Sequence, residues 1–321
     1  MDPAVLSAKI RATLAPCRLG DWPTPLEPAP ALARALGIAA LHLKREDRSA
    51  PCGGGNKVRG LEFLMSGAPG GTTFVTVGGT GSTHCLATAV HARALGCQAV
   101  LAQFDQPETR ESRAVAVVCA TTAALVVRAR RSATVPLAVL AAWHRARRLG
   151  GGRRWIPGGG ASPRAVLGHW LAGLELATQV ADPPDVVLLP LGTGGTAAGI
   201  SLAVATLGWA TRVIAVRVAP RLVANAWRTR RLAGGARRIL ARLGVALPTP
   251  GTLDIVDGLG DGYGHPTPEG ERAQALAREH GLTLDPTYGA KAFAVLLRRG
   301  TGNVQRVVFW HTFALPQPES A

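Results

Sequence analysis

Short apolar runs alternate along the chain with longer segments rich in alanine and leucine. The short runs carry Val, Leu and Ile on both faces, which is typical of parallel strands buried beneath helices. On this pattern we predict strands over residues 41–44, 73–78, 99–104, 124–129, 186–192 and 212–218.

The longer segments have features of helices. Segments 85–96 and 196–208 each end at a glycine, which commonly terminates a helix. Segment 163–180 has apolar residues at helical spacing, and segment 266–281 begins with Pro and Thr and stops at a glycine. Alternating strands and helices predict an α/β fold with doubly wound, mainly parallel sheets that carry helices on both faces. The Gly- and Arg-rich residues 232–242 are interpreted as a loop and a helix start.

The chain of 321 residues has a net charge of +16, which attracts polyanions non-specifically. Nearly all of this charge is arginine, in short clusters such as 128–131, 145–148 and 228–231. Aromatic residues make up only 5% and do not interleave with the clusters, so a platform for stacking bases is not indicated. We interpret the clusters as solvated faces without a specific nucleic-acid partner. A non-catalytic polyanion-binding protein is the alternative from another class.

No membrane or metal partner is expected. No window approaches eighteen uninterrupted apolar residues, and the N-terminus lacks a basic start followed by an apolar run. The cysteines are odd in number, scattered and without a CxxC pair, which favours reduced thiols over disulfides or a zinc site. We therefore expect a cytoplasmic protein.

Lys57 is a candidate nucleophile. It follows three glycines and Asn56 at the start of a predicted helix. The positive end of a helix dipole favours the neutral amine, which is the form that attacks a carbonyl. The chain offers only four lysines for such chemistry, at positions 9, 44, 57 and 291. A surface lysine after a loop is the alternative.

Residues 188–200 read as a buried strand, a Gly/Thr loop and a helix. Backbone amides at such a helix start bind anions, and threonine hydroxyls add hydrogen bonds. The loop lacks a lysine and matches neither common nucleotide-loop pattern, so it predicts a site for a single phosphate monoester. A tight turn without a ligand is the alternative. The loop residues are Gly192, Thr193, Gly194, Gly195 and Thr196.

The segment 76–96 has the same layout of strand, glycine loop and helix. Ser82 and Thr83 are natural helix N-cap residues, and capping alone explains them. Alternatively, the loop grips a substrate carboxylate, with Ser82 facing the reacting carbon. His84 and Cys85 lack metal-ligand spacing and are interpreted as structural or solvent-facing.

The chain has two tyrosines, Tyr263 and Tyr288, and both lie in glycine-rich turn contexts. Tyrosines used for packing normally lie inside strands or helices. A tyrosine hydroxyl acts as an acid, a base or a hydrogen-bond donor, so both are candidate site residues.

In their order along the chain, these four motifs resemble the 1-aminocyclopropane-1-carboxylate deaminase and D-cysteine desulfhydrase family. Its members are pyridoxal-phosphate enzymes of fold type II, the tryptophan-synthase β-subunit type. The resemblance covers residues 20–316. It implies a large cofactor-binding domain from residues 1–58 and 165–321, a small domain from residues 59–164, and a homodimer.

The resemblance also implies residue roles. Lys57 would hold pyridoxal 5'-phosphate as a Schiff base beside Asn56, and residues 192–196 would bind the phosphate. Ser82 would help to move the Cα proton, and Tyr263 and Tyr288 would be the active-site tyrosines. In the segment VVFWHTFALP, Thr312 would lie near the pyridine nitrogen, and the segment IPGGGAS would lie near the mouth of the active site.

Several positions depart from the family pattern. Thr83 replaces an asparagine that contacts the phenolic oxygen of the cofactor, and we assign Thr83 to the cofactor site. Gly289 follows the second tyrosine, where the deaminase has a carboxylate and the desulfhydrase a hydroxyl. Phe313 and Ala314 replace glycines, and Gly60 replaces a lysine.

The resemblance therefore predicts a lyase or deaminase that acts on a small amino acid and releases a 2-oxo acid and ammonia, with sulfide from D-cysteine. A neutral donor such as Thr312 leaves the pyridine nitrogen largely unprotonated, which suits β-elimination and β-replacement over transamination. Because of the departures, a racemase, a β-replacement synthase and a catalytically altered homologue stay open as alternatives.

Overall fold

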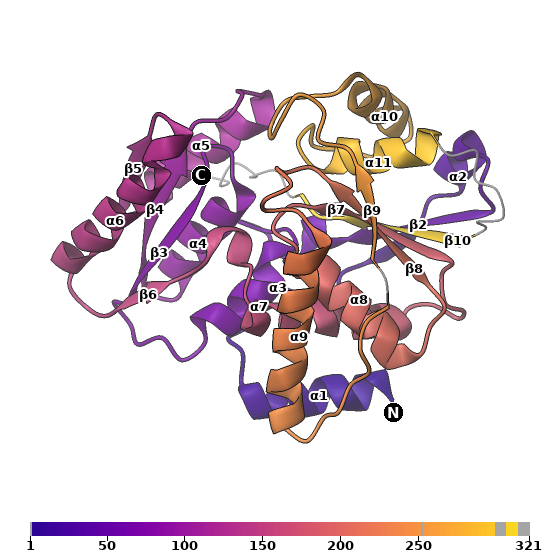
Figure 1. Cartoon of the computed structure of the whole chain (residues 1–321), viewed down its shortest axis with the longest axis horizontal. Coiled ribbons are helices and arrows are strands. Elements are labelled where there is room, and N and C mark those ends of the chain that lie inside the picture. Colours follow the sequence, from indigo (N-terminus) through magenta and orange to yellow (C-terminus); the bar gives the residue numbers. More distant parts are fainter. Residues whose placement is uncertain (1, 252, 299–305, 314–321) are drawn as a thin grey trace.

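Two β-sheets, each covered by helices on both faces, make up the protein (Figure 1). The computed structural model describes residues 2–251, 253–298 and 306–313. All strand pairs but one are parallel in the part of the chain that the structure describes. The predicted doubly wound, mainly parallel α/β fold is thus confirmed.

The larger sheet has six strands in the order β1-β2-β10-β7-β8-β9. These are β1 (Leu26–Pro28), β2 (Ala40–Arg45), β10 (Arg306–His311), β7 (Val186–Leu191), β8 (Arg212–Arg217) and β9 (Asp254–Asp257). Only the edge strand β1 is antiparallel to its neighbour. The C-terminal strand β10 lies between β2 and β7, so both ends of the chain contribute to the middle of this sheet.

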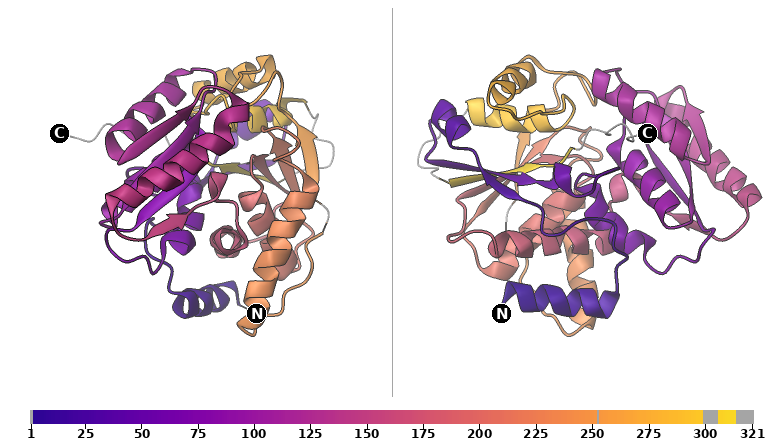
Figure 2. Two further views of the ribbon diagram at one scale, coloured as in Figure 1. Left: turned by 60° about the vertical axis from the view of Figure 1, so that its left-hand side comes forward. Right: turned by 180° about the vertical axis from the view of Figure 1, so that it is seen from behind.

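Helices cover both faces of the larger sheet because successive residues of its strands point to opposite sides. Leu188 of β7 packs in one core, under α2 (Pro30–Leu36), α10 (Pro268–Glu279) and α11 (Gly289–Arg298). Its neighbour Leu189 packs in another core, against α7 (Pro163–Ala177) and α8 (Gly195–Leu207). Outside α7 and α8 lie α1 (Pro3–Leu14) and α9 (Ala226–Arg242), as Figures 1 and 2 show.

The smaller sheet has four parallel strands in the order β5-β4-β3-β6. These are β5 (Leu125–Ala129), β4 (Gln98–Phe104), β3 (Thr73–Gly79) and β6 (Arg153–Trp155). One face packs against α3 (Lys57–Met65), α4 (Thr83–Ala94) and α5 (Arg110–Thr122), and the other against α6 (Val135–Arg145). Short 3-10 helices lie at Glu46–Arg48, Ser132–Thr134, Ala146–Leu149 and Gly158–Gly160.

Strands of the smaller sheet lie between residues 73 and 155, whereas those of the larger sheet lie before residue 46 and after residue 185. The predicted domain boundaries, after residues 58 and 164, fall inside α3 and α7, which pack against each other. The division into two domains stays a prediction.

The interpretation of residues 232–242 as a loop and helix start is wrong. This segment lies entirely within α9, which begins after Asn225, whose side chain accepts a hydrogen bond from the Arg228 backbone N–H (2.8 Å). Leu232 and Leu240 of this helix are buried. Gly235 has a structural reason to be a glycine, because a Cβ there would lie 2.5 Å from Pro163. The unfavourable helix propensity of the two adjacent glycines is thus overridden by tertiary packing.

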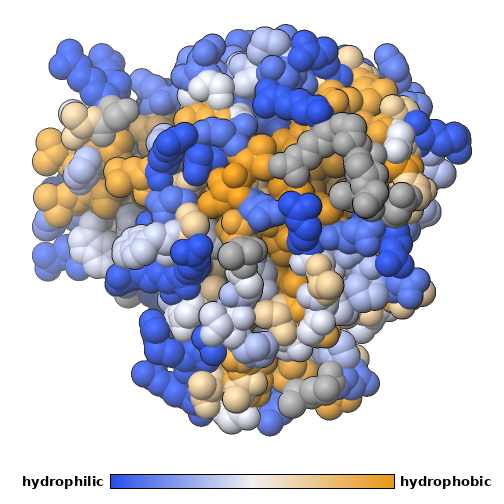
Figure 3. Space-filling model, turned by 45° about the vertical axis from the view of Figure 1, so that its right-hand side comes forward, coloured by the Kyte–Doolittle hydropathy of each residue, from blue (hydrophilic) through white to orange (hydrophobic). Residues whose placement is uncertain are grey.

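Arginines of the predicted clusters lie at the surface, where all but the half-buried Arg228 are exposed. On the face shown in Figure 3, hydrophilic residues are interspersed with apolar ones and do not form one continuous strip. All five cysteines are free thiols. None of the helices described here is long and apolar enough to cross a membrane.

Candidate active site

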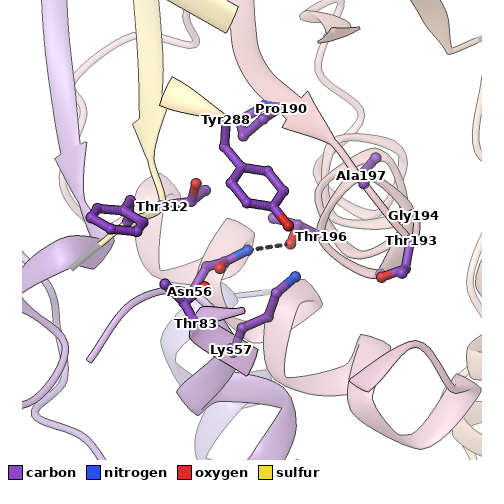
Figure 4. Close-up of a pocket in the computed structure, with 13 residues that line it drawn as sticks. Asn56, Lys57, Thr83, Pro190, Thr193, Gly194, Thr196, Ala197, Tyr288 and Thr312 are labelled. Carbon is purple, nitrogen blue, oxygen red and sulfur yellow. Dashed lines mark hydrogen bonds between the residues drawn. The ribbon is translucent and has the colours of Figure 1, made fainter. Parts of the chain in front are cut away.

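Lys57 is the first residue of α3, as the sequence predicts. Its amine points into a pocket, toward Tyr288 and Thr196 (Figure 4). Burial lowers the pKa of Lys57 from 10.5 to about 8. The predicted shift toward the neutral amine is therefore found, and burial is its cause.

The other three lysines lie in other environments. Lys9 is exposed on α1. The Lys44 ammonium is buried and donates hydrogen bonds to the Thr24 carbonyl and the Gln179 side-chain oxygen, each at 2.7 Å. The Lys291 ammonium donates to the carbonyls of residues 259 (2.7 Å) and 262 (3.1 Å). Of the four, Lys57 is the lysine that lines the pocket.

Across the pocket from Lys57, the Gly/Thr loop joins β7 to the N-terminus of α8. Gly194 is the N-cap residue and has φ +90°, a conformation that favours glycine. The Thr193 hydroxyl oxygen is buried and has no hydrogen-bond partner among the described residues. A helix N-terminus with an unpaired hydroxyl beside it fits an anionic group.

Asn56 links the Gly/Thr loop to Lys57, its neighbour in the chain, through a hydrogen bond. Its side-chain amide donates a hydrogen bond to the Thr196 hydroxyl oxygen (2.7 Å), and its backbone N–H donates to the Thr312 carbonyl (3.2 Å). Because the Thr196 oxygen accepts from Asn56, the hydroxyl proton stays available for another acceptor. Asn56 thus connects α3, the Gly/Thr loop and the end of β10.

Ser82 is the N-cap of α4, and its hydroxyl oxygen accepts from the Cys85 backbone N–H (3.3 Å). The capping interpretation is therefore confirmed for Ser82. Thr83 is the first residue of α4 and lines the pocket. Binding of a substrate carboxylate by the loop before α4 stays a prediction.

His84 and Cys85 are both buried, so the solvent-facing interpretation is wrong. The Thr76 hydroxyl donates to the Ile156 carbonyl (2.9 Å), which leaves its oxygen to accept from His84 Nε2 (2.8 Å). Burial and the nearby Lys57 charge lower the pKa of His84 to about 3. His84 is therefore neutral at physiological pH and has a structural position.

The two tyrosines meet through their hydroxyls, with an O–O distance of 2.6 Å. Tyr288 lines the pocket, and its turn is held by the Asp285 carboxylate, which accepts from the backbone N–H of Tyr288 (2.7 Å) and of Gly289 (2.8 Å). Burial raises the pKa of Tyr263 to about 12 and raises that of Tyr288 well above its usual value of 10. Both phenols stay protonated at neutral pH, so they act as hydrogen-bond or proton donors.

Most of the predicted site residues line one pocket. The predicted residues that line it are Asn56, Lys57, Thr83, Gly192, Thr193, Gly194, Gly195, Thr196, Tyr288 and Thr312. The remaining two adjoin them, because Ser82 precedes Thr83 and Tyr263 bonds to Tyr288. Their catalytic and cofactor-binding roles stay predictions.

Pro190 and Ala197 line the pocket although the sequence did not single them out, and Phe313, a departure from the family pattern, lines it as well. Pro190 lies in the buried strand β7, and a proline inside an apolar strand run was the available signal. The predicted mouth loop lies against the Gly/Thr loop, because a Cβ on Gly159 would be 2.4 Å from the Thr193 hydroxyl oxygen.

The residues fit pyridoxal phosphate. A lysine amine with a lowered pKa faces a helix N-terminus that fits an anionic group, and the unpaired Thr193 hydroxyl lies beside that helix. Two helix-covered, mainly parallel sheets with this pocket are the arrangement expected of pyridoxal-phosphate enzymes of fold type II.

Comparisons with known proteins agree. The family model described as "Pyridoxal-phosphate dependent enzyme" matches residues 17–312. The chain is 35% identical over 307 residues to nocardicin C-9' epimerase of Nocardia uniformis subsp. tsuyamanensis, covering 90% of each chain. It is 31% identical to D-cysteine desulfhydrase of Salmonella choleraesuis, covering 92% of each. The crystal structure of a homologue of the 1-aminocyclopropane-1-carboxylate (ACC) deaminase has a TM-score of 0.80, 28% identity and coverage of 95% of this chain and 94% of that one.

The chain therefore belongs to the pyridoxal-phosphate-dependent enzyme family, in the group of the ACC deaminase and D-cysteine desulfhydrase.

Proposed function

We propose that the enzyme is a lyase or deaminase that acts on a small amino acid and releases a 2-oxo acid and ammonia. The observation that carries this proposal is that the Lys57 amine and the Tyr288 hydroxyl line the same pocket as the Gly/Thr loop. A phosphate held by the loop would place the rest of the cofactor between these two groups. The names of the desulfhydrase and deaminase relatives support this reaction class.

Each group has a proposed task. Bound pyridoxal phosphate supplies an electron sink for the charge left at Cα when a proton is removed. Lys57 would hold the cofactor covalently, and Lys57 or Ser82 would move the Cα proton. The Tyr288 phenol, hydrogen-bonded to Tyr263, would orient the substrate or give a proton to the leaving group. Thr312 would lie near the pyridine nitrogen as a neutral donor.

For a β-substituted amino acid such as D-cysteine, the Cα proton and the sulfur leave. One water molecule then replaces the amino nitrogen, so the products are the 2-oxo acid, ammonia and sulfide.

Epimerisation at Cα is a second candidate. A relative that is 35% identical over 90% of both chains is named an epimerase. Gly289 has no side chain at the position where the deaminase has a carboxylate and the desulfhydrase a hydroxyl. Epimerisation needs only the removal of the Cα proton and its return on the other face. Lys57 and Ser82, on separate helices, are candidates for these two steps.

One screen in D₂O separates the two candidates. Cofactor-loaded protein is incubated with D- and L-amino acids and with 1-aminocyclopropane-1-carboxylate. Elimination releases 2-oxo acid and ammonia, whereas epimerisation gives deuterated, inverted amino acid without oxo acid. The Lys57→Ala variant is the control and gives neither product. Bound cofactor with neither product from any amino acid would instead favour the catalytically altered homologue.

The assembly also belongs to this proposal. We propose a cytoplasmic homodimer that binds no specific nucleic acid, with the domain division of residues 1–58 and 165–321 from residues 59–164. Light scattering of the holoenzyme should give twice the chain mass of 33.3 kDa. A mass of one chain would contradict the dimer.

A further inference from the structure

His169 lies on α7 against the start of the Gly/Thr loop helix, and none of the site roles above uses it. We propose that the His169 imidazole binds the phosphate of the cofactor and takes up a proton when that phosphate binds. This inference rests on the proposed cofactor site, in which residues 192–196 hold the phosphate opposite Lys57.

The position of His169 follows from close packing of α7 on α8. A Cβ on Gly199 would lie 2.4 Å from the His169 Cβ, so only a glycine allows this approach. A Cβ on Gly195 would lie 3.7 Å from both Cδ2 and Nε2 of the imidazole. Since Gly195 is the first residue of α8, the Nε2 edge of the ring lies at the helix end where anions bind.

His169 is also an exception within its helix. It is the only polar residue between positions 165 and 174, and it is 4% exposed. Nε2, the nitrogen that faces Gly195, has no hydrogen-bond partner among the described residues, and neither has the buried Nδ1 on the opposite side of the ring. Buried polar side chains are nearly always paired, so an imidazole without a protein partner leaves Nε2 available to a ligand at the helix end.

The charges around His169 explain why a proton would be taken up. Burial first, and then the positive charges of Lys57 and Arg59 on α3, lower the pKa of His169 well below 6.5. On α9, Arg228 donates through Nε to the Thr193 carbonyl (3.3 Å), so it adds a further cation near the loop. His169 is neutral in these surroundings. A phosphate dianion at the loop reverses the local charge and favours the imidazolium.

The alternative is that His169 only fills space between α7 and α8. Removing the phosphate from the ligand distinguishes the two. Pyridoxal keeps the ring and the aldehyde of the cofactor but has no phosphate. If His169 contacts the phosphate, replacing it weakens the binding of pyridoxal phosphate alone. If His169 only packs between the helices, replacing it weakens the binding of both ligands alike.

The experiment measures the Kd of both ligands for the full-length apoenzyme, for wild type, His169→Leu and His169→Gln. We expect His169→Leu to raise the Kd of pyridoxal phosphate by about 10- to 100-fold, as for loss of a hydrogen bond to a charged group. The Kd of pyridoxal should rise by less than about threefold. His169→Gln keeps a hydrogen-bond donor, so its Kd for pyridoxal phosphate should lie between those of the wild type and His169→Leu. It also preserves the test if the leucine variant does not fold.

A second readout is proton uptake. Calorimetric titration with pyridoxal phosphate in two buffers of different ionisation heat gives the number of protons taken up, which should fall by about one in both variants. His91→Leu is the matched control, since His91 is likewise buried but bonds to the Gly53 carbonyl (3.2 Å) and not to the loop. It should leave proton uptake unchanged.

Equal weakening of both ligands, or unchanged proton uptake, would overturn the proposal for His169. Failure of the underlying site has a different signature. In that case wild-type protein treated with pyridoxal phosphate and borohydride carries no label on Lys57.

Discussion

The Asn56 side-chain amide donates a hydrogen bond to the Thr196 hydroxyl over 2.7 Å, although the two residues are 140 positions apart in the sequence. Asn56 is the residue before Lys57, and Thr196 lies in the first turn of the helix after the Gly/Thr loop. The bond fixes the distance between Lys57, which is proposed to hold one end of the cofactor, and the loop that is proposed to hold the other. Such a fixed spacing pre-organises a site for one ligand length.

Breaking this bond should weaken cofactor binding. Asn56→Ala and Thr196→Val should each raise the Kd of pyridoxal phosphate about 3- to 10-fold, since a buried neutral hydrogen bond contributes about 0.5–1.5 kcal/mol. The double variant is the control. If the residues act through their mutual bond, its effect should be smaller than the product of the single effects. Fully multiplicative effects would mean that the bond carries no coupling.

Much of this site could be predicted from sequence because each motif is local. A glycine loop between a buried strand and a helix favours anion binding at the helix start, and Lys57 follows its own glycines after Asn56. The bond between Asn56 and Thr196 could not be predicted, because it depends on how two sheets and their helices pack. His169 gave no signal either, since one polar residue in an apolar helix has no recognisable pattern.

In the fold as well, some elements could be predicted from the local sequence and others could not. The buried strands β3, β4, β7 and β8 were predicted because they are apolar on both faces. The strand β10 is equally buried but was not among the strands predicted from the pattern. The short strands β1, β6 and β9 were missed because they are only partly buried and carry charged residues. Helix α9 was not recognised because its two adjacent glycines disfavour a helix, whereas burial of Leu232 and Leu240 stabilises one.

Covalent loading of Lys57 should depend on pH. Only the neutral amine attacks the cofactor aldehyde, and the pKa of Lys57 is about 8. The loading rate of apoenzyme should therefore rise with pH and level off above about 8, with about one tenth of the amine neutral at pH 7. Stopped-flow absorbance between pH 6 and 10 measures this rate. A rate still rising at pH 10 would contradict a lowered pKa.

Lys57 should also destabilise the apoenzyme. Its folded-state pKa of about 8 is below the unfolded value of 10.5, so the folded state disfavours the charged amine. The penalty is fully present below pH 8 and disappears as the pH rises toward 10.5. Lys57→Met should raise the free energy of unfolding at pH 7 by about 1–3 kcal/mol. Urea denaturation at pH 7 measures the gain, and exposed Lys9→Met is the control, for which no change is expected.

The tyrosine pair should act as one unit. Tyr288→Phe removes the phenol that lines the pocket, and turnover should fall about 100-fold, within the range for loss of a general acid. Tyr263→Phe leaves the Tyr288 hydroxyl in place but without its 2.6 Å partner, so a fall of about 10-fold is expected. Because burial keeps both phenols protonated, the wild-type rate should show no tyrosine titration below pH 10. Steady-state kinetics from pH 6 to 10 tests all three statements, and a larger loss in Tyr263→Phe would reverse the assignment.

A buried charge cluster supports the helix that carries Lys57. Arg59 donates to both oxygens of Glu46, each at 2.7 Å, and to both oxygens of Glu175, at 2.8 and 3.0 Å. Arg59 and Glu46 are almost completely buried. Burial raises the pKa of Glu175, but Arg59 and then Lys44 outweigh it and hold the pKa at about 2. Removing Arg59 would leave two buried carboxylates with one remaining cation.

Arg59→Met should therefore lower the free energy of unfolding at pH 7 by about 3–5 kcal/mol, as is typical for a broken buried ion pair. The pH dependence should change as well. In the wild type, the Glu175 contribution is fully present above pH 4.5 and is lost as the pH falls toward 2, because its folded pKa lies below the unfolded one. In Arg59→Met this loss should shrink, since the carboxylate is no longer held ionised by Arg59.

Arg212→Met, which removes an exposed ion pair with Asp254, is the matched control and should change stability by less than about 1 kcal/mol. Urea denaturation between pH 3 and 7 measures both effects, and equal losses in the two variants would show that the cluster adds nothing beyond a surface pair.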